Sequence, residues 1–166
     1  MIPIVFVEGD YDRTFVEHVL MLIGCSDWKV GVYQYKEKKP RKVKEYIDAL
    51  EGQYIFLVDT DTAIMGDVEH AKEKKKEQII KLYGVDGDKI IFVVHEIESW
   101  LACGISTFSN PRITKEELFH KAQKQLKKVN RRVIFQKLLE DWDLSLATKR
   151  CEEIRKFVDW LESVCK

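Results

Sequence analysis

The stretch Tyr54-Ile55-Phe56-Leu57-Val58-Asp59-Thr60-Asp61 decides the fold of this chain, because an uninterrupted apolar run ends in two carboxylates. Short continuous apolar runs are typical of strands that are buried on both faces of a parallel sheet. Open parallel sheets bind their ligands beyond the carboxyl ends of the strands. Asp59 and Asp61 are two residues apart, so in an extended chain both side chains project to the same side. We therefore predict a strand that delivers two carboxylates to a ligand site.

Two other apolar runs end in the same way. Ile4-Val5-Phe6-Val7 precedes Glu8-Gly9-Asp10-Tyr11-Asp12, and the run 90–94 precedes His95-Glu96-Ile97-Glu98. Clustered carboxylates without cationic partners repel one another, and a bound metal ion is the usual resolution. Oxygen ligands suit Mg²⁺ or Mn²⁺, and the acids suffice for one or two ions. The candidate metal ligands are Glu8, Asp12, Asp59, Asp61, Glu96 and Glu98, with Glu96 slightly favoured over Glu98.

Helix capping is the structural alternative for two of these acids, since Asp12 and Asp61 each stand where a helix could begin. An Asp at such a position accepts hydrogen bonds from backbone N–H groups of the first turn.

Strands alternate with helices in the first part of the chain, which predicts an α/β fold with parallel pairing and right-handed crossovers. We expect a Rossmann-like, mainly parallel sheet of about four strands flanked by helices. After Glu98 only helical patterns follow, and Ser99 is expected to cap a short helix through the core residues Trp100 and Leu101. We predict an α/β core over 1–104 and a helical extension over 105–166 within one domain. The expected strands are 2–7, 28–35, 54–58 and 89–94, and the later helices are 114–129, 132–139 and 149–164.

Composition excludes several classes of protein. The chain is 45% hydrophobic and 34% charged, which fits a folded globular protein rather than a disordered one. Its 28 basic and 28 acidic residues balance, so net charge indicates no partner. The four cysteines are scattered without a Cys-x-x-Cys pair, so we expect free thiols in a reducing cytoplasm. No apolar run approaches the ~20 residues needed to span a bilayer, and no signal peptide is visible, so no membrane partner is expected.

The segment Val7-Glu8-Gly9-Asp10-Tyr11-Asp12 and the later Leu57-Val58-Asp59-Thr60-Asp61 together resemble the Toprim domain. That domain carries a glutamate after its first strand and an Asp-x-Asp after a later one. The additional Asp12 is closer to the OLD-like nuclease branch. The segment Glu96-Ile97-Glu98-Ser99-Trp100 is also similar to one found in small stand-alone Toprim-like proteins. The resemblance covers roughly 2–101, and the lack of partner domains argues against topoisomerase or primase activity.

The resemblance implies roles for individual residues. Glu8 would act as general acid or base or as a metal ligand, and Asp59 and Asp61 would hold Mg²⁺. Asp12 would support a second ion, with Glu96 or Glu98 completing its site. OLD-like nucleases use a downstream lysine to stabilise charge in the transition state, and Lys137 is the candidate here.

Binding of a nucleic-acid backbone requires cations near the carboxylates. The basic loop 36–42 leaves the second predicted strand at the same edge, although a solvated loop is an equal alternative. The runs 72–76 and 124–128 are interleaved with Glu and Gln and are interpreted as solvent-facing. The candidate nucleic-acid contacts are Lys38, Lys39, Arg41 and Arg132, the last also being the second choice for the role of Lys137.

Three functions remain open at this point. The leading one is metal-dependent cleavage of DNA or RNA, and the second is a RecR-like scaffold that binds nucleic acid or a protein partner without catalysis. A protein partner or a homodimer is compatible with either. The third is a receiver-like domain that binds Mg²⁺, for which Glu8-Gly9 matches the required acidic pair poorly.

Overall fold

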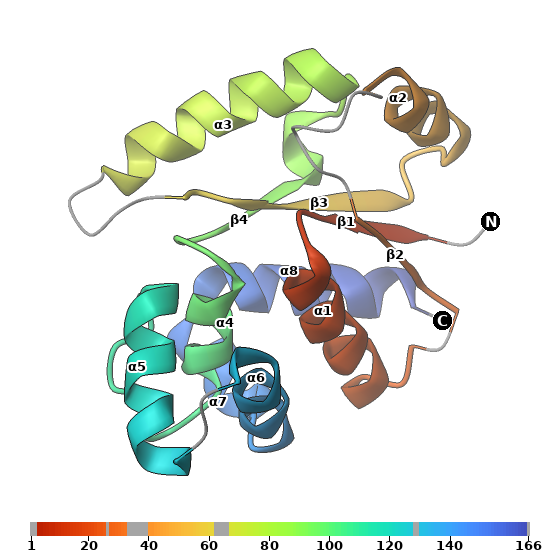
Figure 1. Ribbon diagram of the computed structural model, residues 1–166. Helices are drawn as coiled ribbons and strands as arrows, with labels where there is room; N and C mark the ends of the chain where they lie inside the picture. Colours follow the sequence, from red (N-terminus) through yellow and green to blue (C-terminus); the bar gives the residue numbers. More distant parts are fainter. Residues whose placement is uncertain (1–2, 26, 33–39, 62–66, 128–129, 166) are drawn as a thin grey trace.

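The computed structural model describes residues 3–25, 27–32, 40–61, 67–127 and 130–165. Four strands form one sheet in the order β2-β1-β3-β4, and all three neighbouring pairs run parallel (Figure 1). The predicted α/β class, with a parallel sheet flanked by helices, is confirmed. The strands are β1 Ile4–Val7, β2 Lys29–Val32, β3 Tyr54–Asp59 and β4 Ile90–Val93.

Helices cover both faces of the sheet in unequal numbers (Figure 1). On one face lie α2 Pro40–Ala49 and α3 Val68–Tyr83, and the short helix η1 Gly87–Lys89 leads into β4. On the other face lie α1 Asp10–Leu22 and α8 Glu152–Val164. The remaining helices pack beyond these two and are α4 Ile97–Cys103, α5 Lys115–Leu126, α6 Arg131–Glu140 and α7 Leu144–Arg150.

Successive residues of each buried strand enter two separate hydrophobic clusters. Val5 and Val7 belong to the larger cluster with α1 and α4–α8, whereas Ile4 and Phe6 belong to the smaller cluster with α2 and α3. The side chains of a strand alternate between the two faces of its sheet. Both faces are covered here, which is why these strands read as continuous apolar runs.

Residues of the predicted core and of the predicted extension share the larger cluster. Trp100 and Leu101 are 1% and 0% exposed, which confirms the interpretation that both are core residues. They pack in the same cluster as Phe135 and Phe157 of the later helices. The exact boundary between 104 and 105 stays a prediction. Among the described residues, none of the helices is long and apolar enough to cross a membrane.

Several helices begin at other residues than predicted. Gly9 is the N-cap of α1, so Asp12 lies inside the first turn and is buried rather than capping. Glu96 is the N-cap of α4, and Ser99 lies within that helix and donates a hydrogen bond from Oγ to the carbonyl of Val94 at 2.6 Å. The expectation that Ser99 caps this helix is therefore wrong.

Two other caps follow ordinary capping chemistry. Asp67, not Asp61, caps α3 and accepts hydrogen bonds from the backbone of Glu69 and His70. Thr114 caps α5, and its Oγ1 accepts a hydrogen bond from the backbone N–H of Glu117 at 3.4 Å.

The helix predicted over 149–164 is interrupted. Cys151 adopts an extended conformation (φ −130°, ψ 113°), which ends α7 at Arg150 and makes Cys151 the N-cap of α8. Asp143 caps α7 by accepting from the backbone N–H of Leu146 at 3.0 Å.

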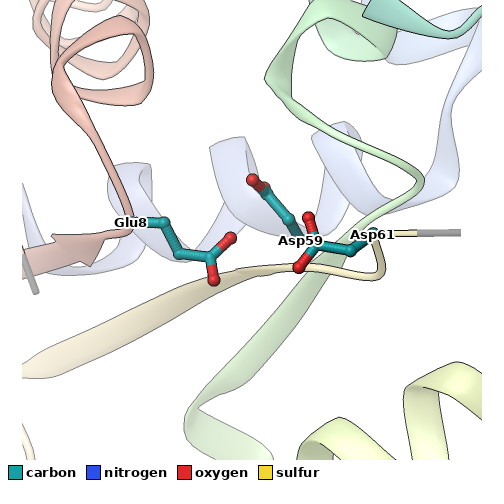
Figure 2. A group of neighbouring side chains, drawn as sticks. All are labelled: Glu8, Asp59 and Asp61. Carbon is teal, nitrogen blue, oxygen red and sulfur yellow. The ribbon is translucent and has the colours of Figure 1, made fainter. Parts of the chain in front are cut away.

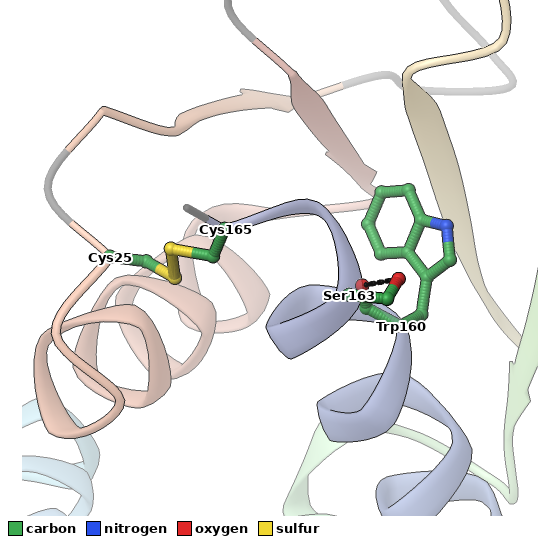
Figure 3. The surroundings of a disulfide bond; sticks show 4 residues. All are labelled: Cys25, Trp160, Ser163 and Cys165. Carbon is green, nitrogen blue, oxygen red and sulfur yellow. Dashed lines mark hydrogen bonds between the residues drawn. A yellow bond between two sulfur atoms is a disulfide. The ribbon is translucent and has the colours of Figure 1, made fainter.

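The expectation of four free thiols is wrong for one pair of cysteines. Cys25 follows α1 and Cys165 follows α8, and the two are joined by a disulfide (Figure 3). Close by, the ring of Trp160 lies edge-on to that of Trp28 at 5.1 Å between centroids. The disulfide thus ties the end of the first helix to the end of the last one, over a sequence separation of 140 residues.

Reduction of the Cys25–Cys165 disulfide is expected to lower the free energy of unfolding by about 3 to 5 kcal/mol, because the bond closes a very long loop in the unfolded chain. Urea unfolding of the Cys25→Ser, Cys165→Ser protein, compared with wild type under non-reducing conditions, measures this. Equal stabilities would contradict the expectation.

Gly104, the C-cap of α4, lies directly beneath the indole of Trp142. A Cβ at this position would overlap Cδ1 and Nε1 of that ring. Trp142 is 6% exposed and donates a hydrogen bond from Nε1 to the carbonyl of Trp100 at 3.0 Å, so the ring has no room to withdraw.

Gly104→Ala is expected to lower the free energy of unfolding by about 1 to 3 kcal/mol through overpacking. Gly87→Ala is the matched control, because the added Cβ would come close to the flexible end of the Lys76 side chain and make an ordinary contact with Ile80. Urea denaturation of both variants provides the comparison. A Gly104→Ala protein no less stable than Gly87→Ala would show that Trp142 does not constrain this position.

Candidate metal centre

Three carboxylates meet at the carboxyl ends of β1 and β3. Glu8 follows the last residue of β1, Asp59 is the last residue of β3, and Asp61 comes two residues later. One ligand oxygen from each can be chosen so that all lie within 4.8 Å of one another. Figure 2 shows the three side chains reaching into the same space from the two strand ends. We refer to Glu8, Asp59 and Asp61 as the acidic triad.

Backbone hydrogen bonds beyond the ends of β3 and β4 hold Asp61 in place. The N–H of Thr60 donates to the carbonyl of Val93 at 2.9 Å, and that of Asp61 donates to the carbonyl of His95 at 3.0 Å. The N–H of His95 in turn donates to Oγ1 of Thr60 at 2.7 Å. Asp61 and His95 have φ values of 49° and 59°, a left-handed conformation that Asp and His adopt more readily than most residues. The two strand ends are therefore locked together.

Asp59 is the buried member of the acidic triad. Its side chain is 7% exposed, and among the described residues its Oδ1 finds no hydrogen-bond partner. Burial, followed by the charge of Asp12 and by a hydrogen bond with Glu8, raises the pKa of Asp59 well above its usual value. A buried carboxylate oxygen without a donor, surrounded by like charges, fits a divalent cation. The acidic triad is thus a suitable donor set for such an ion.

A second pair of buried carboxylates adjoins the acidic triad. Asp12 in the first turn of α1 is 7% exposed, and Glu98 in the first turn of α4 is 3% exposed. Burial, then the charges of Glu8 and Glu98, raise the pKa of Asp12 to about 8. Burial also raises the pKa of Glu98 to about 7, against the charges of Lys115 and Arg131. Asp12 therefore interacts electrostatically with Glu8 and Asp59 of the acidic triad, and Glu98 interacts with Asp12.

Glu98 is the more buried of the two glutamates at the start of α4, and which of them binds a metal ion, with Glu96 slightly favoured from the sequence, stays a prediction. Glu98 is buried and its charge acts on Asp12, whereas Glu96 is the half-buried N-cap of α4. The charge of Glu96 acts on Glu98 instead. The reason is that α4 begins at Ile97, which turns Glu98 toward the interior.

Lys75 of α3 contacts the acidic triad and was missed by the sequence analysis. Its Nζ lies 2.7 Å from Oδ2 of Asp61, and its side chain is 20% exposed. Lys72, also 20% exposed, pairs with Glu153 at 3.3 Å, so the interpretation of 72–76 as a solvent face is wrong for these two lysines. The signal was available, since Lys72 and Lys75 lie on the same helical face as the buried residues Ile79 and Tyr83.

The other basic residues suggested by the sequence lie, where the structure describes them, on α2 and α6. Lys137 lies in the last turn of α6, about half exposed, with Glu140 at 3.8 Å. Arg132 lines a small cavity of about 50 Å³ at the start of α1 together with Asp10 and Tyr11. Arg41 is 91% exposed on α2 and pairs with Glu45. Lys38 and Lys39 lie outside the described residues.

No protein-family model and no curated protein matches the chain. Among solved structures, it is similar to the C-terminal region of the OLD protein of Burkholderia pseudomallei, with a TM-score of 0.48 and 13% identity over 99% of this chain and 98% of that one. It is also similar to the C-terminal region of the OLD protein of Xanthomonas campestris pv. campestris, with a TM-score of 0.43 and 15% identity over 98% and 84% of the two chains. We base the proposed function on the acidic residues themselves.

The metal-free protein is expected to lose stability as the pH rises from about 6 to about 8. Asp12 and Glu98 have raised pKa values in the folded state, so the folded chain binds more protons than the unfolded chain in this range. The stabilisation from their protonation is complete below the unfolded pKa values and is lost as the pH passes through about 7 and about 8. Urea unfolding in the presence of a chelator at several pH values measures the trend.

Asp12→Asn should flatten this dependence, because the side chain at position 12 no longer titrates. Asp159→Asn, at an exposed position of α8, is the control and should keep the wild-type slope. Identical slopes for wild type and Asp12→Asn would contradict the assignment.

Proposed function

We propose that this chain is a Toprim-type, divalent-metal-dependent nuclease domain that hydrolyses phosphodiester bonds in nucleic acid with Mg²⁺ or Mn²⁺. The observation that carries the proposal is the convergence of Glu8, Asp59 and Asp61, with ligand oxygens within 4.8 Å of one another. The order of these acids along the chain, and their places at the ends of two parallel strands, are those expected from the Toprim resemblance.

The acidic triad would hold one cation, and Asp12 with Glu98 would support a second next to it. Mg²⁺ takes one or two carboxylates and keeps its other positions for water and phosphate oxygens, so two adjacent ions can share these five acids. When bound, such ions polarise the phosphoryl group and activate water at neutral pH. Glu8 links the acidic triad to the second pair of carboxylates electrostatically, since its charge acts on both Asp12 and Asp59.

Cations around the site would position the phosphate backbone. Arg131 is fixed by two hydrogen bonds to Glu116, at 2.6 and 3.2 Å, and by stacking over Phe119. Its charge acts on Glu98, and Arg132 follows it in α6 and lines the small cavity with Asp10 and Tyr11. We assign phosphate binding to Arg132. We assign a second contact with the phosphate backbone to Arg41 and the basic loop before it. Such contacts position a nucleic acid without selecting its sequence.

A lysine that stabilises negative charge in the transition state remains part of the proposal. Lys137 is the residue that the Toprim resemblance suggests, and Lys75 is the lysine that contacts the acidic triad. If a metal ion bound the carboxylate of Asp61, the ammonium group of Lys75 would pair with a phosphate oxygen instead.

The ion pair between Lys75 and Asp61 also favours a second candidate, the non-catalytic scaffold. An ammonium group that neutralises part of the triad lessens the need for a metal ion. In that case nucleic acid or a protein partner would bind through the surrounding cations alone.

Isothermal calorimetry with Mn²⁺ and Mg²⁺ is the first test. Wild type is expected to bind, and the Asp59→Asn, Asp61→Asn double variant is expected to bind at least about 100-fold more weakly. The variant loses two of the three carboxylates that would hold the ion, and loss of even a group that only orients a metal ligand costs roughly 10- to 100-fold. Asp10→Asn, at an exposed position in the first turn of α1, is the control and should bind like wild type.

Cleavage of single- and double-stranded DNA and RNA in the same metals is the second test. Activity that requires metal and disappears in Asp59→Asn would support the nuclease. Salt-sensitive binding of nucleic acid that persists in the double variant, without cleavage by wild type, would favour the scaffold instead.

A further inference from the structure

The two cysteines outside the disulfide form a second pair. Cys103 is the last residue of α4, and Cys151 stands between α7 and α8. Both line the same cavity, and each thiol affects the pKa of the other. Although they are far apart in the sequence, the fold therefore brings the two cysteines together.

The two thiols differ in their access to solvent. Cys103 is 1% exposed, and its thiol donates a hydrogen bond to the carbonyl of Pro111 at 3.4 Å. Cys151 is partly exposed. Both line a cavity of about 200 Å³ that also contains Arg112 and Arg150, which is large enough for a small polar molecule. A reagent in this cavity can therefore reach the partly exposed Cys151, and the buried Cys103 lies in the wall of the same cavity.

The surroundings of Cys151 support the thiolate form. The interaction with Cys103 is the largest effect on the pKa of Cys151 and lowers it, against the effect of burial. The same interaction, followed by burial, raises the pKa of Cys103. The thiol of Cys151 donates to Oε2 of Glu153 at 3.5 Å, which opposes loss of its proton, but the charge of Glu153 is partly neutralised by the ion pair with Lys72. Thiolate is the form of cysteine that reacts with oxidants.

We propose that Cys103 and Cys151 are a reversible thiol-oxidation site, at which a small hydroperoxide oxidises Cys151 and Cys103 then closes a disulfide. This function is independent of the acidic triad. A metal site is a poor alternative, because among the described residues the only three-ligand cluster is the triad.

The two steps balance. The thiolate of Cys151 attacks the distal oxygen of the hydroperoxide, the O–O bond breaks, and the alkoxide or hydroxide that leaves takes up a proton, which yields a sulfenic acid. The sulfur of Cys103 then attacks the sulfur of Cys151, the S–O bond breaks, and water leaves with the proton of Cys103. Overall, two thiols lose two electrons and two protons, and one hydroperoxide is reduced.

Tryptic mapping of the intact protein under non-reducing conditions tests the proposal. Cleavage after Lys and Arg places the four cysteines on separate peptides, 14–29, 90–112, 151–155 and 157–166. Stoichiometric hydrogen peroxide is expected to link 90–112 to 151–155 with the loss of two hydrogens, and a thiol reductant should reverse this. The link between 14–29 and 157–166 serves as the internal reference, because it should be present before and after treatment.

Single variants separate the two roles. Cys103→Ser should leave Cys151 as a sulfenic acid that dimedone traps, and Cys151→Ser should leave the buried Cys103 unmodified. In wild type, the link should form at least about tenfold faster in the native protein than in urea, because the fold holds the sulfurs together.

Three results would overturn the proposal. In the first, both thiols can still be alkylated after treatment with peroxide. In the second, Cys151 is oxidised to the sulfinic acid while Cys103 stays reduced. In the third, the disulfide link forms at equal rates in native and unfolded protein. All three are measured on wild type, so they do not depend on the folding of a variant.

Discussion

The parallel pairing of β3 with both β1 and β4 is the constraint on which the rest of the structure depends. Ile4 pairs with Tyr54 and Asp59 pairs with Val93, so the three strands end at nearly the same level. Each strand end is followed by acidic residues, and the register therefore concentrates negative charge at one edge. Because helices cover both faces, part of this charge is buried. Burial and the neighbouring carboxylates raise the pKa values of Asp12, Asp59 and Glu98, so the charged arrangement is unfavourable without a cation.

The sequence could predict this edge because its signal is local. Runs such as 54–58 are apolar throughout since both faces of the sheet are buried, and the change to Asp59 occurs where the strand leaves the core. The α/β class, the strand order along the chain and the core residues Trp100 and Leu101 followed from the same kind of pattern. Parallel pairing then placed Glu8 near Asp59 without any knowledge of the turns between them.

The predictions failed where the exact first residue of a helix decides which side chains are buried. Each residue turns a helix by about 100°, so a start at Ile97 rather than Trp100 determines whether Glu98 points inward. The same holds for Asp12, which lies inside the first turn and is buried because α1 already begins at Asp10. The cysteine pairs were beyond local reasoning altogether, because Cys25 meets Cys165 and Cys103 meets Cys151 only through packing of distant helices. For Lys75, the sequence pattern indicated the helical face on which it lies, but it could not indicate the ion pair with Asp61.

The ion pair between Lys72 and Glu153 has a consequence for the direction from which a ligand can approach. Lys72 belongs to α3 and Glu153 to α8, which cover opposite faces of the sheet, so the pair passes around the rim of the sheet (Figure 1). Both side chains are only about one-fifth exposed, at 20% and 22%, so solvent screens their attraction less than that of a surface pair. Under the proposed function, a nucleic acid would therefore reach the acidic triad from outside, over Asp61, whose side chain is 50% exposed, rather than between the two layers of helices.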